Sequence, residues 1–296
     1  MIDSPGVYTL GADAYHADPC AVPSLSSSVA SIIVMRSPLH AWHAHPRLNP
    51  AHQPEERAEF DLGSAAHALL LEGADRMAVI DAENYRTMAA RDQRDAARAA
   101  GLHPVLRAQH AAVTVMAKIA ERAIARCPDL SGLMLADGDA EQAIIWREGD
   151  TWLRCRPDWL ARDYSVMLDY KTTTDAEPLH FGKHIARMLY HFQAAFYRRG
   201  VKAVTGRDAP FILLAQEIEP PHACTFHGCA PSLAAIAEQM VDQAIRTWAG
   251  CMKADTWPAY SPRIHYHEAA QWAAMEQEER MAGIPYEISQ LWEKQA

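Results

Sequence analysis

The pattern of apolar and polar residues along the chain predicts a fold that mixes helices and strands. Six prolines within residues 1–50 break that stretch into loops and short helices. Further along, apolar residues recur at helical spacing in five segments, and Gly73 and Gly200 follow two of them as predicted ends. The predicted helices span residues 55–72, 88–100, 105–126, 181–199 and 232–253.

Short apolar runs bounded by turn residues predict strands. These strands span residues 142–147, 151–156, 165–170, 211–218 and 223–226. The order of elements predicts an α/β (α+β) fold with one main domain over residues 1–264. We expect a loop-rich part (1–54) and a core (55–264) within it. Residues 265–296 follow as an acidic tail, and their pattern does not indicate a role.

The candidate chemistry is concentrated between residues 154 and 174. An Arg-Pro-Asp triplet ends in Asp158, and its proline closes the predicted strand because proline cannot donate to a sheet. The next strand runs into Asp169-Tyr170-Lys171, where Asp169 and Lys171 project to the same side because strand side chains alternate. A hairpin between the two strands would bring both aspartates and the lysine together. Two carboxylates suit a hard divalent cation, so the pattern indicates metal-assisted phosphodiester hydrolysis.

An acid-x-Lys triplet alone does not establish a catalytic site. In a chain with 37 acidic residues, such a triplet arises by chance about once. A surface ion pair on a strand would have the same sequence. The neighbouring segments therefore decide between the two interpretations.

Several short segments between about Tyr15 and Pro262 follow one another in a characteristic order. They are Ser26-Ser27-Ser28, Ser37-Pro38, Gly63-Ser64-Ala65-Ala66-His67-Ala68-Leu69-Leu70, Tyr85-Arg86-Thr87, Glu141–Trp146, Arg156-Pro157-Asp158, Asp169-Tyr170-Lys171-Thr172-Thr173, Tyr190-His191-x-Gln193-x-x-x-Tyr197 and Trp257-Pro258-x-Tyr260. In this order they resemble the PD-(D/E)XK nuclease superfamily, and within it the phage and prophage exonucleases of the exodeoxyribonuclease VIII (RecE) type.

The resemblance implies a restriction-endonuclease-like core, with a central mixed β-sheet flanked by helices. It also implies a site for Mg²⁺ or Mn²⁺ and a lysine, Lys171, that positions the attacking water. The implied metal ligands are His67, Asp158, Asp169 and the backbone carbonyl of Tyr170. The further residues that would border or support this site are Glu141, Gln193 and Tyr197.

Each of these supporting residues also has a simpler interpretation. A single histidine on an otherwise apolar helix, as His67 is, more often belongs to the core than to a metal site. Glu141 could face solvent at the start of a strand. Gln193 and Tyr197 are four residues apart, so they share one face of a helix, which could be an ordinary polar face.

The net charge of −9 is unusual for a protein that binds nucleic acid, but the charge is unevenly distributed. Residues 86–126 carry eight basic and three acidic side chains, so this segment could follow a phosphate backbone. An exposed helix with solvated arginines would have the same composition. The candidate DNA-binding residues are Arg86, Arg91 and Arg94.

Several classes of protein fit the sequence poorly. The chain has no apolar run long enough for a membrane span and no secretory signal at its start, and its six cysteines are scattered. We therefore expect a cytoplasmic protein. No Gly-rich phosphate loop is present, so the sequence does not support a helicase activity. The spacing of His222, Cys224, His227 and Cys229 does not correspond to a known zinc site.

The interpretation that accounts for most of these features is a Mg²⁺-dependent exodeoxyribonuclease that acts on the ends of double-stranded DNA. The resemblance implies 5′→3′ digestion by a ring-shaped homo-oligomer. It also implies that the 3′ single strands pass to a single-strand annealing recombinase. Two alternatives remain: a structure-specific or restriction-like endonuclease of the same fold, and a catalytically inactive DNA-binding or assembly protein.

Overall fold

The computed structural model of the chain describes residues 1–53 and 62–282. It divides the chain into two compact units, Met1–Ala259 and Tyr260–Ala296. The described helix of the second unit is α10 (Gln271–Ala282). All other elements belong to the first unit, which holds every candidate site residue.

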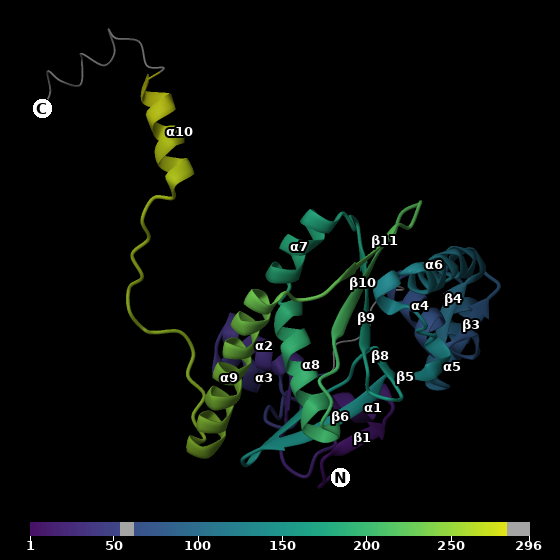
Figure 1. Cartoon of the computed structure of the whole chain (residues 1–296), viewed down its shortest axis with the longest axis horizontal. Helices are drawn as coiled ribbons and strands as arrows, with labels where there is room; N and C mark the ends of the chain where they lie inside the picture. Colours follow the sequence, from purple (N-terminus) through teal and green to yellow (C-terminus); the bar gives the residue numbers. More distant parts are fainter. Residues whose placement is uncertain (54–61, 283–296) are drawn as a thin grey trace, which may run out of the picture. The chain divides into compact units, whose positions relative to one another are not determined.

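A five-stranded mixed sheet forms the centre of the first unit (Figure 1). Its two longest strands run parallel to each other, and the three other strands join the sheet in antiparallel pairs. This confirms the mixed sheet expected from the sequence. In spatial order the strands are β11 (Cys224–His227), β10 (Phe211–Glu217), β9 (Met167–Thr173), β8 (Trp159–Ala161) and β5 (Gly138–Ala140).

A second sheet has four strands, and two of them directly precede or follow strands of the first sheet in the chain. Its order is β1 (Gly6–Thr9), β6 (Gln142–Glu148), β7 (Thr151–Cys155) and β2 (Leu25–Ser26). Because β5 continues into β6 and β7 continues into β8, one antiparallel ribbon passes from one sheet to the other. At that passage the Glu141 N–H donates to the Asp158 carbonyl oxygen at 3.1 Å. The two acids therefore lie where the ribbon changes sheets.

Helices cover both faces of the central sheet (Figure 1). One face packs against α2 (Ser27–Met35), α8 (Tyr190–Thr205) and α9 (Pro231–Ala254), and the other against α4 (Leu62–His67) and α6 (Arg107–Arg126). Alternate residues of β9 enter different cores, with Met167 on the α8 side and Leu168 on the α6 side. Each large apolar side chain buried in this way stabilises the fold by about 1.5–3 kcal/mol.

Two glycines permit close contacts between these layers. A Cβ atom on Gly63 would lie 2.2 Å from Oγ1 of Thr172, so only glycine lets α4 approach β9 so closely. A Cβ atom on Gly200 would lie 2.6 Å from the Trp146 ring, which packs against α8. The expectation that Gly200 ends a helix is therefore wrong. It lies within α8, which ends at Gly206 in a left-handed conformation (φ 76°).

Several predicted boundaries differ from the structure. The helix predicted over residues 181–199 is two helices, α7 (Pro178–Arg187) and α8, separated by Leu189 in a left-handed conformation (φ 56°). The first residues of the helix predicted over 105–126 belong to β4 (His103–Leu106), which pairs with β3 (Met77–Ile80). The remaining helical elements are α1 (Ala12–His16), α3 (Pro38–Ala44), α5 (Met88–Ala99), η2 (Ala74–Arg76), η3 (Pro128–Leu130) and η4 (Leu135–Asp137).

The helix predicted over residues 55–72 is described only from Leu62 onward. After α4 it continues as a π-helical turn, η1 (Ala68–Glu72), and Gly73 follows with a φ of 95°. Residues 54–61 lie outside the described residues. Within residues 1–53 and 62–282, no helix combines the length and apolar character that crossing a membrane requires.

Candidate active site

The candidate site lies beside β9 at the point where its neighbour β8 begins. β8 pairs with β9 only at Trp159–Leu168 and Leu160–Met167, so β8 does not pair with β9 from Asp169 onward. The predicted hairpin between residues 151–156 and 165–170 is therefore wrong, because β8 intervenes and forms the hairpin with β9. The short β8 still brings Asp158 opposite Asp169.

Asp169 is the most deeply buried acid of the site, with a fully buried side chain. Its Oδ2 accepts a hydrogen bond from Nε2 of Gln193 at 2.8 Å. Its Oδ1 contacts the Lys171 ammonium and accepts no other hydrogen bond in the described part of the chain. Asp169 and Lys171 thus lie on the same side of β9, as the alternation of side chains predicts.

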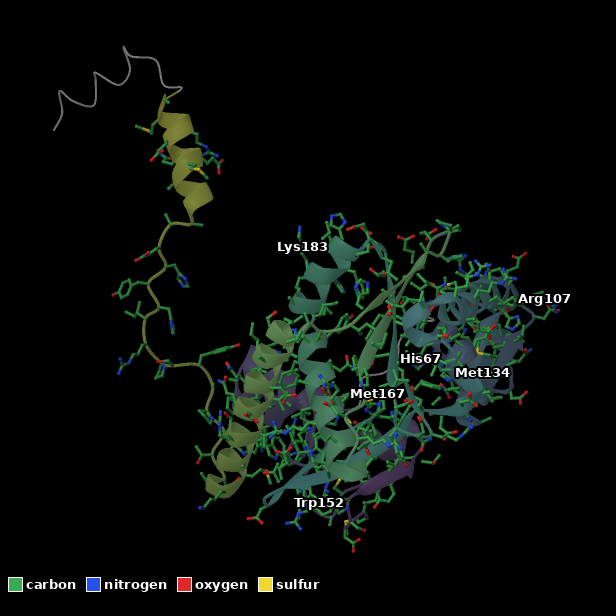
Figure 2. The ribbon with its side chains drawn as sticks, in the orientation of Figure 1. His67, Arg107, Met134, Trp152, Met167 and Lys183 are labelled. Atoms are coloured by element: carbon green, nitrogen blue, oxygen red, sulfur yellow. The ribbon has the colours of Figure 1, made fainter. Side chains whose placement is uncertain are left out.

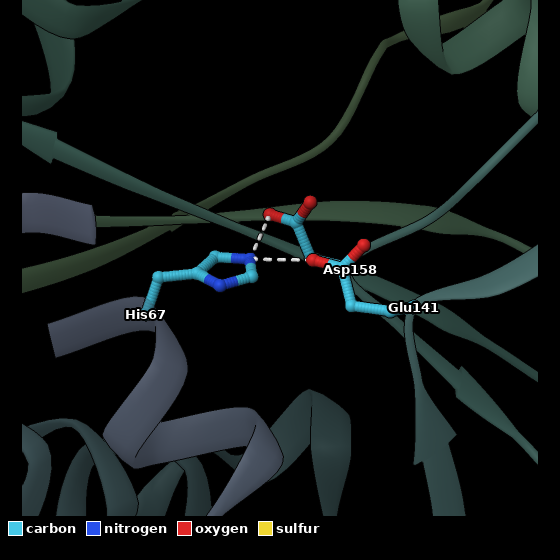
Figure 3. Close-up of side chains that lie close together, drawn as sticks. All are labelled: His67, Glu141 and Asp158. Atoms are coloured by element: carbon cyan, nitrogen blue, oxygen red, sulfur yellow. Dashed lines mark ion pairs between the residues drawn. The ribbon is translucent and has the colours of Figure 1, made fainter. Parts of the chain in front are cut away.

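Asp158 connects β9 to helix α4. Its Oδ2 accepts the Tyr170 N–H at 2.9 Å and lies 3.2 Å from Nε2 of His67. The same oxygen is 3.9 Å from the Lys171 ammonium. Figure 3 shows the His67 ring pointing toward the carboxylates of Asp158 and Glu141. The close approach of α4 at Gly63 brings this histidine to the sheet.

Glu141 is the third acid of the group. It has a left-handed backbone (φ 57°), a conformation that costs a residue other than glycine about 1–3 kcal/mol. Its Oε2 lies 2.7 Å from Nε of Arg156, and its Oε1 lies 3.7 Å from Nε2 of His67. Such strain persists where the surrounding structure holds the residue, and it often marks functional positions.

One set of metal-ligand atoms converges in the described residues. Ligand atoms of His67, Glu141 and Asp158 all lie within 4.8 Å of one another. Two carboxylates and an imidazole form a donor set that a divalent cation accepts. We call the six charged or titratable residues gathered here the site cluster: His67, Glu141, Asp158, Asp169, Lys171 and Arg156.

Burial and neighbouring charges shift the pKa values of this cluster in different directions. Burial favours the neutral carboxyl of Asp158, but the Lys171 ammonium and His67 together hold its pKa below its ordinary value. Burial and the charge of Asp158 raise the pKa of Asp169. Burial also raises the pKa of Glu141. Burial alone would lower the pKa of His67, but its contact with Asp158 raises it. The charge of Asp158 thus disfavours the ionisation of Asp169 and of Glu141, which a bound cation would relieve.

Comparison with known protein families finds a match over most of the chain. Residues 35–270 match the model of a family described as "PDDEXK-like domain of unknown function (DUF3799)". The chain belongs to this PDDEXK-like family. No curated protein matches the chain.

A solved structure shows a similar fold. The chain is similar to the crystal structure named "Putative exonuclease" from Eubacterium rectale, with a TM-score of 0.58 and 14% sequence identity over 94% of this chain and 100% of that chain. This likeness confirms the PDDEXK-like fold. A second structure, SSO0001, has a TM-score of 0.25 and 15% identity over 37% of this chain and 50% of that chain, which is too low to support an argument.

Helix α8 of the PDDEXK-like domain carries both of the predicted polar residues, Gln193 and Tyr197, but their surroundings differ. Gln193 faces the site and donates to the Asp169 carboxylate at 2.8 Å. Tyr197 is buried, and its ring packs edge-on against Phe211 at 5.6 Å. Tyr190, one turn before Gln193, places its ring 5.5 Å from the Lys171 ammonium. The site residues therefore contact Gln193 and Tyr190.

Two of the three candidate DNA-binding arginines, Arg91 and Arg94, lie on helix α5, and Arg86 comes just before it. Arg91 donates to the carbonyl oxygen of Arg86 at 2.7 Å, and both side chains are exposed. Arg94 pairs with Asp95 at 2.8 Å and lies 5.6 Å from the centre of the Tyr85 ring. Figure 2 shows neighbouring Arg107 at the outer edge of the unit and His67 near its middle. Their role in DNA binding stays a prediction.

The alternative zinc set does not assemble. Of the four side chains, the ring of His227 hydrogen-bonds the Thr225 hydroxyl at 2.8 Å, and the ring of His222 lies 3.2 Å from the Glu217 carbonyl oxygen. Cys224 contacts the carbonyl of His222 at 3.7 Å. Among the described residues, the only converging ligand group is that of His67, Glu141 and Asp158.

Sequence reasoning did not assign a role to Arg156 or Tyr15. Arg156 binds Glu141 and also lies 5.0 Å from the centre of the Tyr15 ring. One signal was available, because Arg154 and Arg156 are two residues apart and so project to the same side. Their common neighbour Tyr15 comes from a distant part of the sequence, which no local pattern can indicate.

Proposed function

We propose that this chain is a metal-dependent deoxyribonuclease that digests linear double-stranded DNA in the 5′→3′ direction. Membership of the PDDEXK-like family supports a nuclease. The observation that carries the proposal is the meeting of Asp158, Asp169 and Lys171 beside the part of β9 that does not pair with β8. Exonuclease activity and its direction rest on the resemblance to RecE-type enzymes.

The donor set fits Mg²⁺ or Mn²⁺. The cation would be held by the side chains of His67, Asp158 and Asp169 and by the backbone carbonyl of Tyr170. Glu141 lies beside these ligands. Asp169 keeps one buried carboxylate oxygen whose only partner in the described residues is the Lys171 ammonium. When bound, the cation supplies a Lewis acid that polarises a phosphate oxygen and acidifies water.

The chain's own residues would hold the reacting groups in place. The Lys171 ammonium lies between two carboxylates, where it can hold a water or an anionic phosphate oxygen near Asp158 and Asp169. Gln193 fixes the Asp169 carboxylate, and the Tyr170 N–H fixes that of Asp158. Contacts to the DNA backbone would make cleavage independent of sequence and sensitive to salt.

The same proposal includes partners. As in the enzymes that the chain resembles, the protein would assemble into a ring-shaped homo-oligomer around the duplex. The 3′ single strands that it leaves would pass to a single-strand annealing recombinase. The mass of the protein in solution tests the ring, and co-purification tests the contact with a recombinase.

The test compares linear and covalently closed duplex DNA, each with Mg²⁺ and with EDTA. We expect loss of the linear DNA only, dependent on metal, and no loss with Asp169→Ala. The matched control is Asp139→Ala, because Asp139 is an exposed aspartate paired with Arg162 and should be dispensable.

Each rival function gives a different result. Nicking of the closed circle would identify an endonuclease of the same fold. Binding to DNA without cleavage of either substrate would identify a catalytically inactive binding or assembly protein. Equal cleavage by Asp169→Ala and by the natural chain would remove the site assignment.

A further inference from the structure

The carboxylate of Glu141 is divided between two neighbours. Arg156 holds Oε2 at 2.7 Å, and Oε1 faces Nε2 of His67 at 3.7 Å. A charge-assisted hydrogen bond of this kind fixes the direction of the free oxygen. Arg156 therefore sets which oxygen of Glu141 faces the candidate metal ligands.

The Arg156 guanidinium is itself held by an aromatic ring. Its Cζ lies 5.0 Å from the centre of the Tyr15 ring, and the Cζ of Arg154 lies 5.5 Å from the same ring. Both distances are within the range of a cation–π interaction. The Tyr15 ring is buried, with 7% of its surface exposed, so these interactions are poorly screened by water.

The segment that carries Tyr15 is fixed by a second group of polar and charged residues. We call this group the anchor cluster: Asp18, Ser24, His45, Arg47 and Arg154. Asp18 accepts hydrogen bonds from the backbone N–H and the hydroxyl of Ser24 at 2.8 and 2.6 Å. Arg154 lies 3.2 Å from Asp18 and donates to the Ser24 carbonyl oxygen at 2.6 Å. Tyr15 is three residues before Asp18, so the anchor cluster fixes its position.

We infer that Tyr15 and Arg156 are positioning residues that orient Glu141 toward His67 and Asp158, so that residues before the family match complete the metal site. This inference rests on the proposed metal-dependent function. The matched region begins at residue 35, whereas Tyr15 lies on α1 (Ala12–His16). The metal site would thus depend on a segment that contributes no ligand itself.

The experiment measures Mn²⁺ binding by electron paramagnetic resonance, together with unfolding in urea, on full-length variants without DNA. Removing a residue that orients a metal ligand typically weakens metal binding by about 10–100-fold. We expect a loss of that size for Tyr15→Leu and for Arg156→Gln. Tyr15→Phe keeps the ring face and should stay within about twofold of the natural affinity. Arg156→Lys keeps the charge but not the planar fork, so it should recover only part of the affinity.

The matched control is Arg147→Gln. Arg147 lies 5.4 Å from the centre of the Trp152 ring, which gives a similar cation–π pair on the same ribbon but outside the site. Its loss should leave Mn²⁺ affinity unchanged. A folded Tyr15→Leu protein with natural affinity would overturn the inference, as would a Tyr15→Phe protein as weak as Tyr15→Leu.

Two further outcomes keep the test decisive. If Tyr15→Leu does not fold, unchanged Mn²⁺ affinity in Arg156→Gln overturns the inference by itself. Asp158→Asn separates this failure from failure of the proposed function. If Asp158→Asn loses Mn²⁺ while Arg156→Gln keeps it, only the positioning role is overturned. If Asp158→Asn also keeps its affinity for Mn²⁺, the assignment of the metal site is wrong.

Discussion

The site cluster and the anchor cluster both border β7, yet their charges are balanced in opposite ways. The anchor cluster sets one carboxylate, Asp18, against the guanidinium groups of Arg47 and Arg154. The site cluster sets three carboxylates against one lysine and one arginine. A buried carboxylate surrounded by donors is stable as it is, whereas a surplus of carboxylates favours binding of a cation.

The hydrogen bonds show the same difference. Asp18 accepts from the backbone and the hydroxyl of Ser24 and lies 3.4 Å from His45. Asp169 accepts from Gln193 on one oxygen, and among the described residues the other oxygen contacts only the Lys171 ammonium. The pKa of Asp18 is lowered, because His45 and Arg154 outweigh the effect of burial, whereas that of Asp169 is raised. Charge balance thus distinguishes a structural cluster from a cluster that can bind metal.

The largest effect should come from removing one acid of the site cluster. We expect Asp169→Ala to lower the rate of DNA cleavage by at least about 1,000-fold, because transition-state charge would lose its support. The free energy of unfolding should hardly change, since one carboxylate is removed from a group that has too many. A cleavage assay and urea unfolding on the same preparation check both parts. A large loss of stability would show that the site cluster, like the anchor cluster, stabilises the fold.

Removing a cation from the anchor cluster should have the opposite effect. Arg154→Ala leaves Asp18 with fewer partners in a buried place, which typically costs about 3–5 kcal/mol. We expect this loss in the free energy of unfolding measured with urea. Arg107→Ala removes an arginine from an exposed pair with Asp81 and should cost less than about 1 kcal/mol. Equal losses for the two variants would contradict the comparison.

Metal should stabilise the protein through the site cluster, and more at pH 8 than at pH 6. Asp169, Glu141 and His67 have raised pKa values, so they keep their protons to higher pH and a cation must displace these protons. A carboxyl with a raised pKa also favours the metal-free fold at low pH and loses that contribution as pH rises through its folded pKa.

This pH dependence is measurable by thermal unfolding with Mn²⁺ and with EDTA. At a metal concentration 100 times the dissociation constant, the expected stabilisation is about 2.7 kcal/mol. Asp158→Asn should abolish most of it. A stabilisation that is larger at pH 6 would show that the carboxylates of the site do not bind the metal.

The smallest effect should come from cations outside both clusters. We expect the double variant Arg86→Gln with Arg91→Gln to weaken DNA binding a few-fold and to reduce its salt dependence, because exposed cations mainly release counterions from the backbone. Metal affinity and stability should not change. Fluorescence anisotropy at several salt concentrations checks this, with Arg147→Gln as the control. Identical salt slopes would remove α5 from the DNA-binding surface.

Local patterns predicted the parts of the site that depend on one strand or one helix. Asp169 and Lys171 lie on one side of β9 because alternation is a property of the strand itself. The apolar helix around His67 and the long helix near the end of the first unit were also visible in the spacing of apolar residues. His67 was assigned to the site by the resemblance, since its own helix gave no such signal.

Contacts between distant segments were beyond local patterns. The three residues of β8 are too few to show a strand pattern, so the hairpin was assigned to the wrong pair of strands. The break between α7 and α8 depends on Leu189, whose left-handed backbone is imposed by packing rather than by its residue type. The contact of Arg156 with Tyr15 joins segments that only the folded chain brings together.

The ribbon that changes sheets at Glu141 and Asp158 has one further consequence. It folds back at Gly149, the tip of the hairpin between β6 and β7, where the backbone is left-handed (φ 57°). A cut at this tip would give two fragments, one with His67 and Glu141 and the other with Asp158, Asp169 and Lys171. Neither fragment would contain all the candidate metal ligands, but strand pairing along the ribbon could rejoin the two fragments. The PDDEXK-like domain is therefore suited to a split enzyme, whose activity would report reassembly of its two halves.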